Sequence, residues 1–142
     1  MSWSSSWDLE CQADGFWKLD KRPWLPPETR VDLCFWRDFD NATEGISFDV
    51  MHLIKSISRN GVPDDVSQSY IDRWRDFVLH CQEEGLQMPI FTWVQLKDTL
   101  DLNWDSVVQN NSAKRLEIDR WVEHLQSLGR PENFRVICCT HR

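Results

Sequence analysis

Nine tryptophans in a chain of 142 residues constrain the fold more than any other feature of this sequence. Each indole brings a large apolar surface and an N–H group that needs a hydrogen-bond partner when it is buried. A domain of this length buries roughly 68% of the surface that its unfolded chain exposes. The sequence therefore predicts one domain, residues 1–142, in which some tryptophans fill the core and others stay on the surface, where they can anchor a partner.

The chain is acidic, with 23 Asp and Glu residues against 16 Lys and Arg residues and a formal net charge of −7. Nucleic-acid binding draws its affinity from Lys and Arg side chains that neutralise phosphates, so we expect no direct contact with nucleic acid. An acidic surface favours partner proteins with a basic surface. Negative charge also serves solubility alone, and that simpler explanation is the more common one.

The five cysteines lack the spacing of a disulfide framework or of a zinc site. We therefore expect reduced thiols, no metal and a cytoplasmic location. No glycine-rich phosphate loop is present, so no cofactor is expected. The N-terminus does not have the composition of a signal peptide, and no apolar run is long enough to span a membrane.

Three segments are predicted to form strands. Residues 7–19 alternate apolar and polar side chains around Ala13-Asp14-Gly15, which is typical of a β-hairpin. Residues 31–36 are expected to form a central strand. Residues 134–139 are β-branched and apolar, and we expect this closing strand to lie beside residues 31–36.

Helical spacing of apolar residues and capping residues predict four helices. The first spans residues 48–58 after Ser47, and the second runs from Ser67 to about residue 84. The third begins at Thr92, which forms a capping-box pattern with Gln95, and the fourth spans about 113–128. The sequence thus predicts an α+β fold in which a small sheet, made of the N-terminal hairpin plus central and C-terminal strands, packs with about four helices.

The helical spacing assigns Trp74, Trp93 and Trp121 to the core, whereas Trp3, Trp24 and Trp36 are expected on the surface. For Trp24 the alternative is a lid over the edge of the core. Asp64 and Asp65 precede a helix, where stabilisation of its N-terminus explains them without any partner. The candidate binding residues are Trp24, Trp36, Arg37, Arg59, Asp64 and Asp65.

The sequence carries no signature of catalysis. It contains no nucleophile elbow, and its four histidines have no local partner for acid–base chemistry. An enzyme would require Asp38, Asp64 and Asp105 to converge around a pocket. A nucleotide could instead be held without a glycine loop, by stacked indoles and by arginines such as Arg59, Arg73, Arg75 and Arg135.

Several motifs together resemble a family of small, uncharacterised tailed-bacteriophage proteins. These motifs are Gly61-Val62-Pro63-Asp64-Asp65-Val66-Ser67, Trp74, Thr92-Trp93-Val94-Gln95-Leu96, Asn103-Trp104-Asp105 and Phe134-Arg135-Val136-Ile137. The chain departs from the family's His-Ser-x-Ser segment, which here reads Met88-Pro89-Ile90-Phe91-Thr92, and from its terminal aromatic–acidic run. The resemblance covers about two thirds of the chain and implies a phage accessory protein in the host cytoplasm, without implying a reaction.

Together these features predict a non-enzymatic accessory protein that binds and inhibits a host protein with a basic surface, in counter-defence or host takeover. A protein that sequesters a small nucleotide signal is one alternative, and an enzyme of unmarked type is another.

Overall fold

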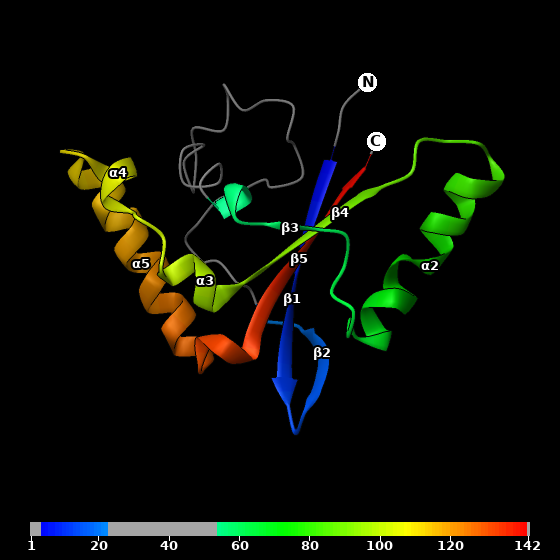
Figure 1. Ribbon diagram of the computed structural model, residues 1–142, viewed down its shortest axis with the longest axis horizontal. Coiled ribbons are helices and arrows are strands. Elements are labelled where there is room, and N and C mark those ends of the chain that lie inside the picture. Colours follow the sequence, from blue (N-terminus) through cyan, green and yellow to red (C-terminus); the bar gives the residue numbers. More distant parts are fainter. Residues whose placement is uncertain (1–3, 23–53, 142) are drawn as a thin grey trace.

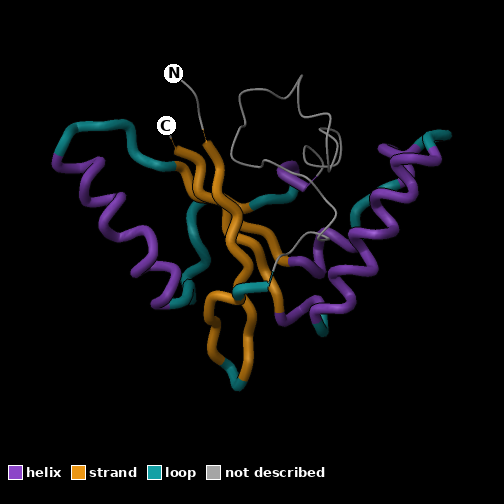
Figure 2. Tube along the Cα trace, turned by 180° about the vertical axis from the view of Figure 1, so that it is seen from behind, coloured by secondary structure: helices purple, strands orange, loops and turns teal. Residues whose placement is uncertain are grey.

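The computed structural model describes residues 4–22 and 54–141 and has an α+β fold with helices on both faces of one sheet (Figures 1 and 2). The sheet is antiparallel, with the strand order β2-β1-β5-β4-β3. Its strands are β1 (Ser4–Ala13), β2 (Phe16–Asp20), β3 (Arg59–Asn60), β4 (Ile90–Gln95) and β5 (Phe134–His141). The helices are α2 (Gln68–Glu83), α3 (Leu96–Leu100), α4 (Asp105–Val108), α5 (Ser112–Leu128) and the 3-10 turn η2 (Pro131–Asn133). The predicted fold class is confirmed.

The predicted N-terminal hairpin is confirmed as β1 and β2. Asp14 and Gly15 form its two-residue turn with φ values of 56° and 83°. Both values lie in the left-handed region, which Gly adopts without steric cost and Asp tolerates better than most residues. The turn sets the register that places Ala13 opposite Phe16 and Leu9 opposite Asp20.

Strand β5 is the central strand of the sheet. It pairs with β1 along one edge and with β4 along the other. Cys138 and Cys139 point to opposite faces of β5, and both are at most 1% exposed, so helices or other covering segments bury both faces. The neighbour expected for this strand, residues 31–36, lies outside the described residues, and β1 and β4 occupy the two edges of β5 instead.

The main core lies between one face of the sheet and α3, α4 and α5. Trp104 and Trp121 meet in this core edge to face, with ring centroids 5.3 Å apart and an interplanar angle of 79°. The Trp104 indole N–H donates to the Thr99 carbonyl at 3.0 Å. The buried members of this core are Leu9, Ile54, Val94, Leu96, Trp104, Val108, Ile118, Trp121, Leu125, Leu128, Phe134 and Val136.

Helix α2 covers the opposite face of the sheet (Figure 1). It begins as predicted after Ser67, whose hydroxyl oxygen accepts the Tyr70 N–H at 3.1 Å. Trp74 and Phe77 contact the ring of His141 on β5, with centroids 5.8 and 5.0 Å away. This second layer is smaller and more polar than the main core, because strand β1 turns the carboxylates of Asp8 and Glu10 towards it.

The helix predicted to begin at Thr92 is wrong. Residues 90–95 form strand β4, and helix α3 begins at Leu96. Ile90 to Val94 are all β-branched or aromatic, and pairing with β5 decides their conformation. The Thr-x-x-Gln spacing from Thr92 to Gln95 therefore arises by chance within a strand.

The tryptophan assignments have mixed outcomes. Trp121 is 1% exposed and lies in the core as predicted. Trp93 and Trp74 are only half-buried and lie outside the main core, which corrects their assignment to it. Trp93 differs because it stands on a strand, where helical spacing does not apply. Trp3, Trp24 and Trp36 lie outside the described residues.

The remaining helix predictions are confirmed within the described residues. Helix α2 ends within one residue of its predicted end, and α5 spans residues 112–128. Of the predicted helix 48–58, only the end is described, with helical residues from Ile54 to Ser56. Ser47 and most of that helix lie outside the described residues.

The N-cap of α5 supports a first prediction. The Asn111 side-chain oxygen accepts the N–H groups of Ala113 and Lys114, both at 3.1 Å. We expect Asn111→Ala to lower the free energy of unfolding by about 1 kcal/mol, because these helix N–H groups lose their acceptor. Urea denaturation measures the change. Asn110→Ala is the matched control and should leave stability unchanged; an equal loss in both variants would contradict the capping role.

Candidate binding surface around Arg135

Arg135 lies in strand β5 with its side chain buried. It faces Glu10 of β1 on one side and Gln95 of β4 on the other. The side chains of Arg135 and Glu10 are 2% and 0% exposed. A charge removed from water at this depth is tolerated only when it is paired and fully hydrogen-bonded.

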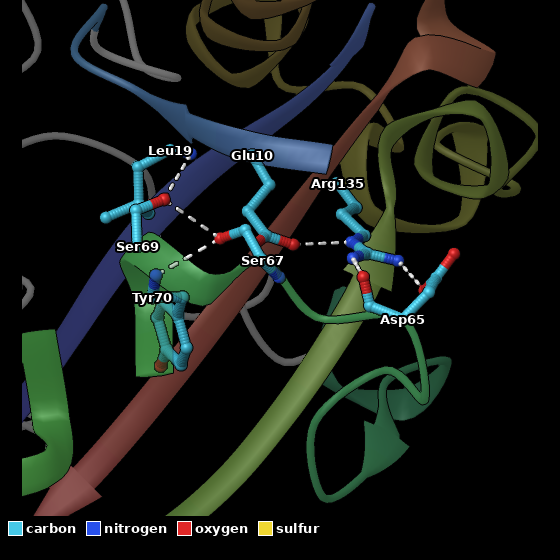
Figure 3. Close-up of polar contacts among 7 residues, drawn as sticks. All are labelled: Glu10, Leu19, Asp65, Ser67, Ser69, Tyr70 and Arg135. Atoms are coloured by element: carbon cyan, nitrogen blue, oxygen red, sulfur yellow. Dashed lines mark hydrogen bonds and ion pairs between the residues drawn. The ribbon is translucent and has the colours of Figure 1, made fainter. Parts of the chain in front are cut away.

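The polar contacts of Arg135 meet that requirement (Figure 3). Its Nε donates to Glu10 Oε1 at 2.6 Å, and its Nη1 donates to Asp65 Oδ1 at 2.6 Å. Its Nη2 donates to the main-chain oxygen of Asp65 at 3.1 Å. Arg135 therefore ties the loop before α2 to the centre of the sheet.

The second oxygen of Glu10 extends this network into α2. Glu10 Oε2 accepts the Ser67 N–H at 2.9 Å, and Ser67 in turn caps the helix. The Ser69 hydroxyl donates to Ser67 Oγ and accepts the Leu19 N–H of β2, both at 3.2 Å. One buried ion pair thus fixes where α2 starts against three strands (Figure 3).

Two tryptophans enclose the Arg135 guanidinium. Its Cζ lies 3.9 Å from the ring centroid of Trp17 and 5.8 Å from that of Trp93. The Arg59 guanidinium stands over Trp93 at 4.8 Å. Indoles and cations therefore alternate across four strands, in the order Trp17, Arg135, Trp93, Arg59, and we call these four residues the Trp–Arg row. Each such contact is worth about 0.5–2 kcal/mol, the larger values applying where water is excluded.

Asp65 is the exposed member of the network. Its side chain is 67% exposed although Arg135 beside it is 2% exposed. Hydrogen bonds from Arg135 lower the pKa of the Asp65 carboxyl below its usual range, against a smaller opposing effect of desolvation. The carboxylate is thus held in one place while most of its surface remains open to a partner.

This pKa shift predicts a pH dependence of stability. A carboxyl whose folded-state pKa is lowered stabilises the fold above its unfolded-state pKa, about 3.9, and loses this contribution as the pH falls through the lower folded-state value. At pH 6 we expect the free energy of unfolding of the wild-type chain to be higher than that of Asp65→Asn by about 1 kcal/mol or less, because the Asp65 carboxyl is exposed. The difference should shrink below pH 4 in parallel urea denaturations. A constant difference from pH 6 to pH 2 would contradict this role.

The structure brings together some of the predicted binding residues. Arg59 belongs to the Trp–Arg row, Asp65 binds Arg135, and Asp64 is exposed next to Asp65. Trp24, Trp36 and Arg37 lie outside the described residues.

Sequence reasoning missed the role of Glu10, Trp17 and Trp93, and considered Arg135 only as a possible nucleotide contact. The available signal was Arg135, a charged residue within an otherwise apolar closing strand. Glu10 gave no such signal, because it stands at a polar position of the alternation in the hairpin.

The carboxylates that an enzyme would require do not all meet. Asp64 lies in the loop before α2, on the α2 face of the sheet, whereas Asp105 begins α4 on the opposite face and pairs with Arg115. Asp38 lies outside the described residues. Of the other arginines considered for a nucleotide, Arg73 pairs with Asp8 at 3.1 Å and Arg75 with Asp72 at 2.8 Å, away from the Trp–Arg row.

The described cysteines and histidines form no cluster that could hold a metal ion, and burial keeps one of the thiols protonated. Within residues 4–22 and 54–141, no three His, Cys, Asp or Glu side chains lie together in a way that could hold a metal ion. Burial raises the pKa of the Cys139 thiol to about 12. This thiol therefore stays protonated at neutral pH and is a poor nucleophile.

Comparisons with protein-family models, with curated proteins and with solved structures give no match for this chain. Across the described part of the chain, no helix is both long and apolar enough to cross a membrane.

Proposed function

We propose that this chain is a non-enzymatic phage accessory protein that binds a basic surface of a host protein in the host cytoplasm and inhibits it, in counter-defence or host takeover. The observation that carries the binding role is the exposed carboxylate of Asp65, held by a buried arginine beside half-buried indoles. The phage origin rests on the motif resemblance, and the basic partner on charge complementarity.

The arrangement around Arg135 has the properties of a preorganised binding surface. Two hydrogen bonds from one buried guanidinium fix the position of Asp65 and of its loop, so little conformational entropy remains to be lost on binding. Tryptophan and arginine are the residue types most enriched among the side chains that dominate interface energies. The carboxylates of Asp64 and Asp65 favour a basic partner and speed its approach.

The proposal is tested with the intact chain immobilised and exposed to lysate of a bacterial host. A retained protein is identified, purified and titrated against three chains: wild type, Asp64→Lys and Asp119→Lys. Asp119 is exposed on α5, on the opposite face of the sheet, and therefore lies away from the proposed surface. Both variants replace Asp by Lys, so they carry the same change of charge. We expect Asp64→Lys to weaken binding by about tenfold or more, since it places like charges together, and Asp119→Lys to change it little. Inhibition is then measured with the purified partner in its own assay.

Two results would contradict the proposal. One is that no host protein binds the wild-type chain in a saturable manner. The other is that the two charge reversals weaken binding equally, since the acidic surface around Asp65 would then have no special role.

The Trp–Arg row also favours a second candidate, a protein that sequesters a small nucleotide. Stacked indoles interleaved with arginines suit a base and a phosphate. Against this, Glu10 and Asp65 already accept a hydrogen bond from each guanidinium nitrogen of Arg135 and place negative charge where a phosphate would lie. A nucleotide at concentrations far above its dissociation constant should raise the melting temperature if this candidate is right; no shift would exclude the nucleotides tested.

A further inference from the structure

The Trp–Arg row ends differently on its two sides. On the β3 side it ends in a cation, Arg59, which stands over Trp93. On the hairpin side it ends in an aromatic ring, Trp17, whose contact with Arg135 uses one face of the indole. Within the described residues, Arg135 is the one cation found over the Trp17 ring, and Trp17 itself stays partly exposed.

We propose that the second face of Trp17 receives an arginine or lysine side chain from the basic partner, which extends the alternation of ring and cation by one member. This inference rests on the proposed function and names the chemistry of its contact. Arg135 already shows what this environment binds, since it stacks on Trp17 and pairs with the Asp65 carboxylate at the same time.

The charges around Trp17 favour a cation over an anion. The Trp17 indole is close enough to the Asp65 carboxylate to help lower its pKa, so the ring and the exposed charge are neighbours. Arg135 contributes one positive charge to this cluster, whereas Glu10 and Asp65 contribute two negative charges. The surplus is negative, and exposed Asp64 adds to it. A guanidinium or ammonium arriving here gains both the attraction of the ring face and that of the carboxylates.

The geometry also keeps the cost of this contact low. Trp17 is fixed by its stack on Arg135, and β2 is held to β1 through the hairpin register. The ring therefore loses little freedom when a partner side chain stacks on it. Arginine should be preferred to lysine, because its planar guanidinium can stack on the indole while it also bonds Asp65.

The test follows the indole N–H resonances of the full chain by nuclear magnetic resonance, with Trp17→Phe used to assign the Trp17 signal. The probe is acetyl-Gly-Arg-Gly-amide, and the matched control is the same peptide with citrulline, which keeps the shape of arginine but has no charge. We expect a saturable shift of the Trp17 signal, with the arginine peptide binding about fivefold or more tightly than the citrulline peptide. Asp64→Asn should weaken binding of the arginine peptide, whereas Asp119→Asn should leave its binding unchanged.

Equal binding of the two peptides, a shift centred on indoles other than Trp17, or equal binding of a glutamate-containing peptide would overturn the inference. Because these peptides are tested on the wild-type chain, the result does not depend on a variant that fails to fold. The two proposals also fail separately. A host partner that binds without moving the Trp17 signal contradicts this inference alone, whereas a Trp17 site without any host partner contradicts the proposed function alone.

Discussion

Arg135→Met is expected to lower the free energy of unfolding by about 3–5 kcal/mol, because it leaves the carboxylate of Glu10 buried without its cation. The side chain of Glu10 is fully buried, so water cannot replace the missing partner. Asp65 and the two indoles of the Trp–Arg row lose their contacts at the same time. For a domain of this size the loss corresponds to a fall in melting temperature of roughly 10–17 °C.

The double variant Glu10→Gln/Arg135→Met separates the charge from the packing. Glutamine is neutral but still offers an oxygen to the Ser67 N–H, which keeps the cap of α2 supported. We expect the double variant to be more stable than Arg135→Met alone in urea denaturation. If it is equally unstable or less stable, the buried charge is not the cause of the loss.

Trp121→Ala should have an effect of similar size for a different reason. Trp121 is 1% exposed, lies at the centre of the main core and packs edge to face on Trp104. Truncation removes its transfer free energy and leaves a cavity beneath α5, and such changes cost about 3–5 kcal/mol. Thermal and urea denaturation followed by circular dichroism measure the loss.

Leu116→Ala is the matched control for this prediction. Leu116 lies on the same helix but is 52% exposed, so its truncation should change stability by about 0.5 kcal/mol or less. Trp121→Phe, which keeps an aromatic ring in the core, should lose less than Trp121→Ala. A Trp121→Ala chain as stable as Leu116→Ala would show that α5 is not held to the sheet through this residue.

Local patterns in the sequence were sufficient for much of the fold. The hairpin follows from period-two alternation around Asp14-Gly15, and α2 and α5 follow from apolar stripes behind the capping residues Ser67 and Asn111. In each case a short stretch of chain contains both the element and its stop signal. The fold class could therefore be predicted without any tertiary information.

For residues 90–95, local patterns were not sufficient to predict the secondary structure. Their aromatic and β-branched side chains fit either a buried helix segment or a strand, and only pairing with β5 decides between them. The candidate site is non-local in the same way. Glu10 and Arg135 are 125 residues apart in the sequence, and only the register of β1 against β5 places them opposite each other.

The central position of β5 has a consequence for how the chain folds. This strand follows all the others described along the chain, yet β1 and β4 have no contact through the sheet until it lies between them. Pairing of β1 with β5 places Leu9 opposite Val136 and so closes a long loop of chain. The entropy lost in joining such distant segments slows folding. We therefore expect the sheet to assemble late and in one cooperative step. The hairpin of β1 and β2 is synthesised early, but it cannot join β4 in one sheet until β5 has been synthesised.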